Sequence, residues 1–173
     1  MKAYWFSNND LRLGYGDGRQ VKLGRTHKYK SPLKLCESGL HASTLLIDAL
    51  RYAPGHHLWV VELSGQILKG DDKLCASERT YLQHLNCEKL LREFARKQAL
   101  INIEKIHPYT DQYDLIVQYL QTGDESIQSA AESAAWSAAW SAAESVAESA
   151  ARSAANAMLT QMVEAELAKK ENL

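Results

Sequence analysis

Apolar and polar residues alternate in short runs through the first part of the chain, which is the pattern of half-buried strands. Residues 2–6 form an aromatic-rich run and residues 58–63 the most apolar run, so we predict a strand at each. Alternating residues on both sides of Gly16-Asp17-Gly18 predict a β-hairpin that turns at these three residues. Apolar residues at helical spacing over 45–53 predict one helix. Residues 1–75 are therefore predicted to form a mixed α+β domain.

Two shorter strands and a helix start are predicted between the hairpin and that helix. Residues 33–36 and 40–42 are apolar runs separated by the turn residues Glu37-Ser38-Gly39. Ser43 or Thr44 is the predicted N-cap, because a short hydroxyl side chain accepts a hydrogen bond from a free backbone N–H at the start of a helix.

The middle of the chain changes to helical spacing. Apolar residues recur three or four positions apart over 81–95, and Asn86 is a predicted cap where one helix gives way to the next. A shorter helix is predicted to follow and to end at Gly123. Residues 76–122 are therefore predicted to be a helical segment.

The last part of the chain repeats a Ser-Ala-Ala-X tetrad over residues 129–157. Because Ala is the best helix former and neither Gly nor Pro follows Gly123, we predict one long helix over 123–173. Trp136 and Trp140, one turn apart, would share a face of this helix. The helix would extend over roughly 70 Å at 1.5 Å per residue, which is longer than the rest of the protein can cover.

That length predicts a homo-oligomer, and a two-fold dimer through the C-terminal helix is the simplest closed form. The pair Trp136 and Trp140 and an apolar stripe over 158–163 are the surfaces that the dimer would bury. The alternative is a monomer in which the repeat breaks near Ser145 and folds back over the first domain as a helical hairpin.

Composition limits the classes of partner. The chain of 173 residues has 20 Lys or Arg and 21 Asp or Glu, a formal net charge of −1, so neither nucleic acid nor an anionic membrane is a predicted partner. The apolar runs are too short to span a bilayer. Three unclustered Cys without a recognisable signal peptide predict free thiols and a cytoplasmic location.

One local charge cluster stands against this balance. Seven side chains that can carry positive charge gather around the predicted hairpin: Arg19, Lys22, Arg25, His27, Lys28, Lys30 and Lys34. The cluster is either the solvent-facing side of a strand or a patch that binds a phosphate or an acidic group. If it is a binding patch, Arg25, Lys28 and Lys30 are its candidate residues, as Trp136 and Trp140 are for the helix.

Candidate catalytic residues are few. His41, the pair His56-His57 and Tyr52 are polar groups near the predicted core, from which a general acid or base could be drawn, but no nucleophile or orienting carboxylate stands at a readable spacing. Structural or surface roles are the alternative that we favour. Glu62 with the turn Asp71-Asp72-Lys73 is faintly similar to the acidic cluster that holds a divalent ion in many nucleases. No basic groove is predicted beside these residues, so a turn after a core strand explains them better.

Metal binding is not predicted. Cys36 with His41, and His84 with Cys87, could supply four ligands, but zinc sites show tighter paired spacings. No metal or other cofactor is therefore expected.

Three stretches together resemble a phage- and prophage-encoded domain family of unknown function. They are residues 34–42 (KLCESGLHA), residues 61–67 (VELSGQI) and residues 71–76, followed by an Ala- and Trp-rich C-terminal helix. The resemblance covers about residues 1–80 and the Ala- and Trp-rich composition of the C-terminal helix. It implies a bacteriophage accessory product in the cytoplasm of an infected bacterium, where such products commonly bind a host or defence component.

A second similarity is to the ADP-ribosyltransferase fold. It rests on residues 39–43, on Ala49-Leu50-Arg51-Tyr52 before a strand, and on the strand Val61-Glu62-Leu63. The His or Arg that holds the nicotinamide ribose in that superfamily has no counterpart in residues 2–6. This similarity would imply an NAD-dependent enzyme that uses Tyr52 and Glu62.

Three functions follow as hypotheses. The first is a non-catalytic phage protein that binds and inhibits or redirects a host protein, including one of an anti-phage defence system. The second is an ADP-ribosyltransferase-like enzyme that modifies a host target. The third is a structural or assembly protein that oligomerises through its long helix.

Overall fold

The computed structural model describes residues 1–101, 103, 111–131 and 148–171. Contacts within the chain divide it into two units, Met1–Glu88 with Ala154–Leu173, and Lys89–Ser153. Each unit is described by itself. The domain boundaries expected from composition, after residues 75 and 122, stay a prediction.

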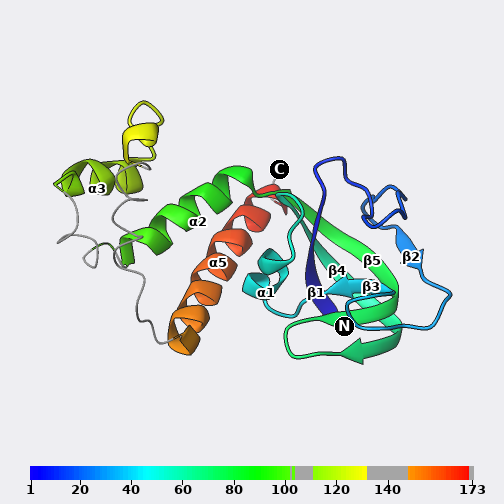
Figure 1. The fold of residues 1–173 in the computed structure, drawn as a ribbon. Coiled ribbons are helices and arrows are strands. Elements are labelled where there is room, and N and C mark those ends of the chain that lie inside the picture. Colours follow the sequence, from blue (N-terminus) through cyan, green and yellow to red (C-terminus); the bar gives the residue numbers. More distant parts are fainter. Residues whose placement is uncertain (102, 104–110, 132–147, 172–173) are drawn as a thin grey trace. The chain divides into compact units, whose positions relative to one another are not determined.

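An antiparallel five-stranded sheet forms the centre of the first unit (Figure 1). Its strands are β1 (Lys2–Ser7), β2 (Thr26–Lys28), β3 (Leu40–Ala42), β4 (His57–Lys69) and β5 (Leu74–Asn86). β4 lies between β1 and β5, and the other edge of β5 is shared end to end by β2 and β3. The expected α+β class, with a strand-rich first part followed by helices, is confirmed.

The long hairpin of β4 and β5 departs from the sequence prediction. The helical segment predicted over 76–122 is wrong up to Asn86, because residues 76–86 belong to β5, a strand of 13 residues. β5 has a pairing partner along both edges, and its pairing with β4 extends from Leu74 to Asn86. Backbone hydrogen bonds on two edges outweigh the weak local preference of a short apolar run. The strand predicted at 58–63 is confirmed and is longer, since it continues to Lys69.

The two faces of the sheet bury different residues because side chains alternate along each strand. One face, called the loop face, carries Ala3 and Trp5 of β1, Trp59, Val61 and Leu63 of β4, and Tyr81 of β5. Leu13 and Val21, from the connection between β1 and β2, pack on it. The opposite face, called the helix face, carries the alternate residues Phe6, Leu58 and Val60, which are also buried. The irregular connection therefore covers part of the loop face.

Helices cover the helix face (Figure 1). α1 (Leu46–Arg51) contributes the buried Leu46 and Ala49. The C-terminal part of α5 (Glu148–Glu171) contributes Leu159 and Val163, which are 0% and 1% exposed. Asn156 fixes the two helices together, because its Oδ1 accepts a hydrogen bond from the backbone N–H of Ile47 at 3.1 Å.

The apolar stripe predicted over 158–163 is thus partly used inside the chain itself. Leu159 and Val163 cannot also line a seam between two copies while they stay buried in their own unit. The predicted dimer stays a prediction. Residues 132–147, with Trp136 and Trp140, lie outside the described residues, as does the continuity of the predicted long helix.

Several local predictions need correction. The expected hairpin around Gly16-Asp17-Gly18 contains only one bridge, between Arg12 and Gln20. Residues 33–36 form a turn closed by the Lys34–Ser38 bridge and not a strand, and Cys36 has φ 68°. The N-cap of α1 is Leu45, without a side-chain hydrogen bond, so the expected Ser43 or Thr44 cap is wrong. Ser43 instead pairs with Tyr4 through both backbone groups.

Two of the helices predicted for the middle part, the one after Asn86 and the one that ends at Gly123, are confirmed. α2 (Glu88–Ile101) begins next to Asn86, whose Oδ1 accepts a hydrogen bond from the backbone N–H of Glu88 at 3.0 Å, so Asn86 is the expected cap. α3 (Tyr113–Thr122) ends at Gly123, which has φ 68° and donates its N–H to Tyr119 at 2.7 Å. Among the described residues, no helix combines the length and the apolar character needed to cross a membrane.

Candidate functional site

Strand β2 places one histidine inside the protein between two outward-facing residues. Thr26 and Lys28 are exposed, whereas His27 is 2% exposed. The register puts His27 opposite Arg79 of β5, and cross-strand neighbours on one face are close enough to touch. Tyr81, two residues further along β5, lies on the same face. The sheet thereby gathers an imidazole, a guanidinium and a phenol beneath the β1–β2 connection.

The phenol oxygen of Tyr81 joins these three side chains. It lies 2.9 Å from Nδ1 of His27 and accepts hydrogen bonds from Nε and Nη2 of Arg79 at 3.2 and 3.1 Å. Nη1 of Arg79 donates to the backbone oxygen of His41. Burial lowers the pKa of the Arg79 guanidinium. No ion pair among the described residues includes Arg79, so a buried positive charge is held by neutral groups.

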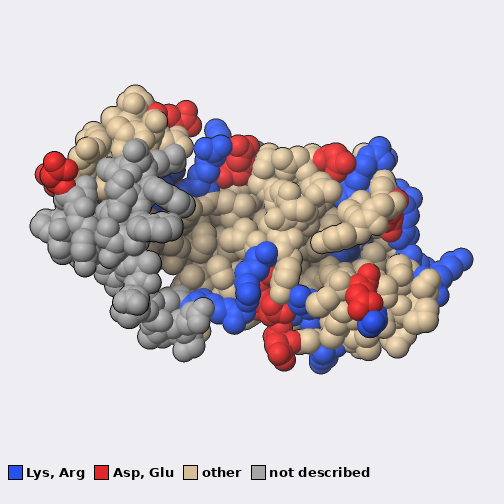
Figure 2. All heavy atoms as spheres, in the orientation of Figure 1, with Lys and Arg blue, Asp and Glu red and all other residues tan. Residues whose placement is uncertain are grey.

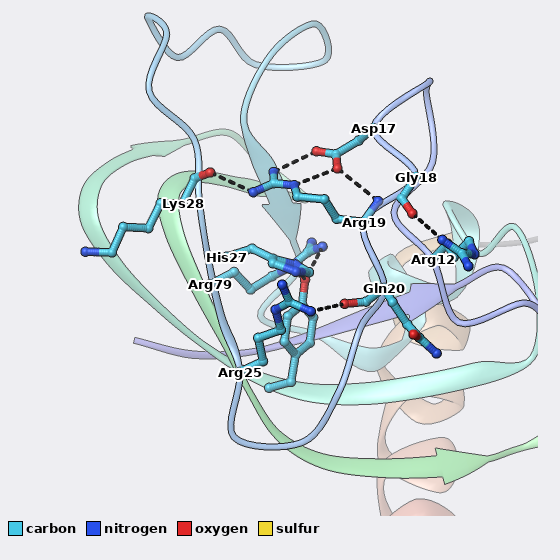
Figure 3. Close-up of polar contacts among 10 residues, drawn as sticks. Arg12, Asp17, Gly18, Arg19, Gln20, Arg25, His27, Lys28 and Arg79 are labelled. Carbon is cyan, nitrogen blue, oxygen red and sulfur yellow. Dashed lines mark hydrogen bonds and ion pairs between the residues drawn. The ribbon is translucent and has the colours of Figure 1, made fainter.

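The same surroundings keep His27 neutral. Burial lowers the pKa of its imidazole to about 4, and the nearby charges of Arg19, Arg25 and Arg79 act in the same direction. At pH 7 the ring therefore carries one proton. Figure 3 shows the side chains of Arg19, Arg25 and Arg79 around His27; the first two come from the connection before β2 and the third from β5.

Arg19 is locked in position. Its Nε and Nη2 donate to the two carboxylate oxygens of Asp17, each at 2.7 Å, and its Nη1 donates to the backbone oxygen of Lys28 at 3.0 Å (Figure 3). Such a two-bond pair is strong and directional. The hydrogen bonds from Arg19 hold the pKa of Asp17 below its usual value. Arg19 thus ties the irregular connection to β2.

The surface above this cluster is strongly positive. We call residues 11–30 the cationic segment. Its charged residues are Arg12, Asp17, Arg19, Lys22, Arg25, Lys28 and Lys30, and six positive charges with one negative charge give +5 in a chain of net charge −1. Figure 2 shows Lys and Arg atoms gathered where Figure 1 places β2 and the connection before it.

These charges are unevenly neutralised. Lys28 forms an ion pair with Glu78 at 2.9 Å. The side chains of Lys22 and Lys30 are exposed, and neither ammonium has a hydrogen bond or an ion pair with the residues that the structure describes. The predicted binding residues Arg25, Lys28 and Lys30 therefore lie on one exposed segment, and Lys22 adds a second unpaired ammonium to that of Lys30.

Tyr52, His41 and Glu62 do not form a common site. The Tyr52 hydroxyl donates to Asp72 at 2.5 Å, and the Lys73 ammonium lies 3.9 Å from the centre of the Tyr52 ring. His41 accepts a hydrogen bond from the backbone N–H of Cys36 at 3.1 Å. Glu62 is exposed on β4 and pairs through its backbone with β1 and β5. No described contact joins Tyr52 to Glu62.

The other histidines form a separate stack at the far end of β4 and β5. Nδ1 of His57 and Nε2 of His84 are 2.9 Å apart, and the His84 ring stacks on Trp59 with 4.3 Å between ring centres. Burial lowers the pKa of His84 to about 4, and the nearby His57 and Lys170 act in the same direction. Within the described residues, no group of three or more His, Cys, Asp or Glu is arranged to hold a metal ion.

Sequence reasoning missed Arg79 and Tyr81, the two residues at the centre of the cluster. Both were assigned to a region of expected helix, where their common face could not be recognised. One signal could have found them: Thr80 and Tyr81 are strand-favouring residues that follow the turn Gly70-Asp71-Asp72 after a strong strand. This signal supports the alternative that the residues after the turn form a second strand, which pairs with the preceding strand as a hairpin.

The comparisons with known proteins give a family and no activity. Residues 1–93 match the family model described as Domain of unknown function (DUF7666). The match covers all five strands and ends within α2. No curated protein and no solved structure matches the chain.

Proposed function

Since the chain belongs to the DUF7666 family, a domain of unknown function, we propose its function from its own geometry: it is a non-catalytic binding protein whose cationic segment docks on an acidic surface of a partner protein. The observation that carries the proposal is the charge of +5 in residues 11–30, in a chain whose other residues together carry −6. A charge of this density attracts an acidic surface over several ångströms and orients it before contact.

The cationic segment is suited to docking because contacts with the rest of the domain fix its backbone, although it has little regular secondary structure. Leu13 and Val21 anchor it on the loop face, and the Arg19–Asp17 pair and the bond to Lys28 brace its centre. A surface that is already ordered loses less conformational entropy when a partner binds. The exposed lysines are then free to meet carboxylates of the partner.

In this proposal the protein is a phage accessory product and the partner is a protein of the bacterial host, including its defence systems. The residue patterns at 34–42 and 61–76, which resemble a phage-encoded family, motivate this choice of partner. The ADP-ribosyltransferase alternative has no comparable geometric support, because no described contact joins Tyr52 to Glu62.

The test compares two double charge reversals in the full chain. Lys22→Glu with Lys30→Glu removes the free charges of the cationic segment. Lys69→Glu with Lys89→Glu is the control, since both of these lysines are also exposed and the change in net charge is identical. Each protein is immobilised and exposed to bacterial lysate, and every captured protein is purified and its dissociation constant measured at 50 and 300 mM salt.

We expect a captured acidic protein that binds the first variant at least about tenfold more weakly than the control, with a difference that shrinks at high salt. Equal affinity of the two variants would overturn the proposal. So would an increase in mass of a captured protein when NAD is added, because that result would show the enzyme and not the binding protein.

A further inference from the structure

The direction of the hydrogen bonds at Tyr81 fixes the proton on His27. The Tyr81 oxygen already accepts two hydrogen bonds from Arg79, so its own hydrogen points to the remaining partner, Nδ1 of His27, at 2.9 Å. Nδ1 is therefore an acceptor. Because the neutral ring carries one proton, that proton is on Nε2.

This Nε2–H group is buried and has no hydrogen-bond partner among the described residues. A buried donor without an acceptor costs about 1–3 kcal/mol, and native proteins keep few of them. The donor belongs to a side chain that is 98% buried, since His27 is 2% exposed. A hydrogen-bond acceptor supplied from outside the chain would remove this cost.

The charges around the ring favour a negatively charged acceptor. Arg19, Arg25 and Arg79 all raise the local positive potential at His27, and Asp17 is a carboxylate that acts against them. Asp17 is already engaged by Arg19. No carboxylate of the described residues binds Arg79, so the buried cluster keeps an excess of positive charge that an anion would offset.

Arg25 is the side chain best able to admit such an anion. It is exposed, and its guanidinium makes one hydrogen bond, a long one of 3.4 Å to the backbone oxygen of Gln20 (Figure 3). Its backbone is fixed on β5, because Gly24 donates to Tyr81 at 2.8 Å and Tyr81 donates to Arg25 at 3.2 Å. The side chain can therefore turn while its base stays in place.

We propose that the Nε2–H group of His27 and the guanidinium of Arg25 form a recognition site for one oxyanion, a carboxylate or a phosphate group. The inference rests on the proposed function in one respect: the oxyanion is carried by the acidic partner that the cationic segment docks. Arg25 binds the anion from the outside and His27 from the inside, while Arg79 holds Tyr81, and through it the His27 ring, in the orientation that this requires.

Nitrogen and proton NMR of the His27 ring tests the site on the full chain. The probes are inorganic phosphate and sodium acetate, each titrated to 50 mM at pH 7 against sodium chloride of equal ionic strength. Three proteins are compared: the wild type, Arg25→Gln, and the control Lys22→Gln, which removes one charge from the same segment. The Lys22 side chain is exposed. Lys22 contacts Arg25 through its backbone oxygen, which accepts a hydrogen bond from the Arg25 N–H at 3.2 Å, and the substitution leaves this bond in place.

We expect a saturable shift of the His27 Nε2–H signal with one of the two anions, weakened about tenfold or more in Arg25→Gln, which corresponds to one lost charge-assisted hydrogen bond. Lys22→Gln should weaken it less than about threefold. Saturation with acetate assigns a carboxylate, and saturation with phosphate assigns a phosphate group. No shift with either anion, or an equal loss in both variants, overturns the site.

The two proposals can fail separately. Lys22 and Lys30, which are reversed in the partner-capture experiment, are outside the oxyanion site. If that experiment succeeds while the His27 signal does not move, the oxyanion site is wrong and the proposed function stands. If the signal responds and no partner is captured, the site stands as a property of the chain and the acidic protein partner is wrong.

Discussion

The Arg79 guanidinium carbon lies 3.8 Å from the centre of the Trp5 ring, although β4 separates the strands that carry them. Trp5 pairs with Trp59 across β1 and β4, and Arg79 pairs with Leu63 across β4 and β5. The long arginine side chain therefore lies along the loop face and reaches over the central strand. Arg79 thus links β5 to β1 across β4.

This arrangement predicts a large effect of Arg79→Lys. Lysine keeps the charge, but its single ammonium cannot reproduce the hydrogen bonds to Tyr81 and His41 or the flat stacking on Trp5. We expect the free energy of unfolding to fall by about 2–4 kcal/mol, measured by urea denaturation at pH 7. Arg12→Lys, at an exposed arginine with one backbone bond, should change it by less than about 0.5 kcal/mol. Equal stability of the two variants would contradict the role of Arg79.

Alanine substitutions at Gly16 and Gly39 should differ in their cost, because the first adds only backbone strain and the second adds backbone strain and a steric clash. Gly16 has φ 80° with nothing within 4 Å of an added Cβ, whereas Gly39 has φ 115° and an added Cβ would lie 2.4 Å from the sulfur of Cys75. Gly16→Ala should cost about 1 kcal/mol of stability. Gly39→Ala should cost at least about 2 kcal/mol more, because the buried Cys75 must move. Thermal melts of both variants that coincide would refute the contact.

Acid should destabilise the protein through its histidines. The pKa values of His27 and His84 are about 4, below the ordinary value of 6.5, because burial disfavours the charged ring. Between these values the unfolded chain binds more protons than the folded one, so stability is fully present above about pH 6.5 and is lost as the pH falls toward 4. Each such histidine contributes a slope of about 1.4 kcal/mol per pH unit.

The check is the free energy of unfolding measured from pH 4.5 to 7.5 for the wild type and for His84→Gln. Between pH 5 and 6, the free energy of unfolding of the variant should depend less steeply on pH than that of the wild type, by the equivalent of about one proton. Above pH 7, the free energy of both proteins should level off in the same way. A slope that does not change would show that His84 titrates alike in the folded and unfolded chains.

Removal of α5 should destabilise the sheet even though the family match ends at residue 93. Leu159 and Val163 are buried on the helix face, and Asn156 binds the backbone of α1. A chain that ends at Thr122 lacks all three residues. We expect it to unfold at a lower urea concentration than the full chain. Leu159→Ala in the full chain should reproduce about 2–5 kcal/mol of the loss. A truncated protein as stable as the intact one would show that α5 is dispensable.

Local patterns predicted the parts of the fold whose signals are themselves local. The aromatic run of β1, the apolar run of β4 and the turn residue Gly123 at the end of α3 were recognisable because alternation and backbone conformation depend on near neighbours. Asn86 was recognisable as a cap for the same reason. The stretch over 81–86 was not, because a short apolar run fits a strand and a helix equally well.

By itself the sequence determined where positive charge accumulates and which segments could be strands, since charge and periodicity are properties of the residues alone. Only the tertiary structure decided that His27, Arg79 and Trp5 belong together. They come from β2, β5 and β1, and their meeting depends on strand order and register. It also decided that a neutral histidine would be buried beneath a positive segment, because burial and the charges of distant residues set its pKa. Such long-range pairings leave no mark at the spacing of neighbouring residues.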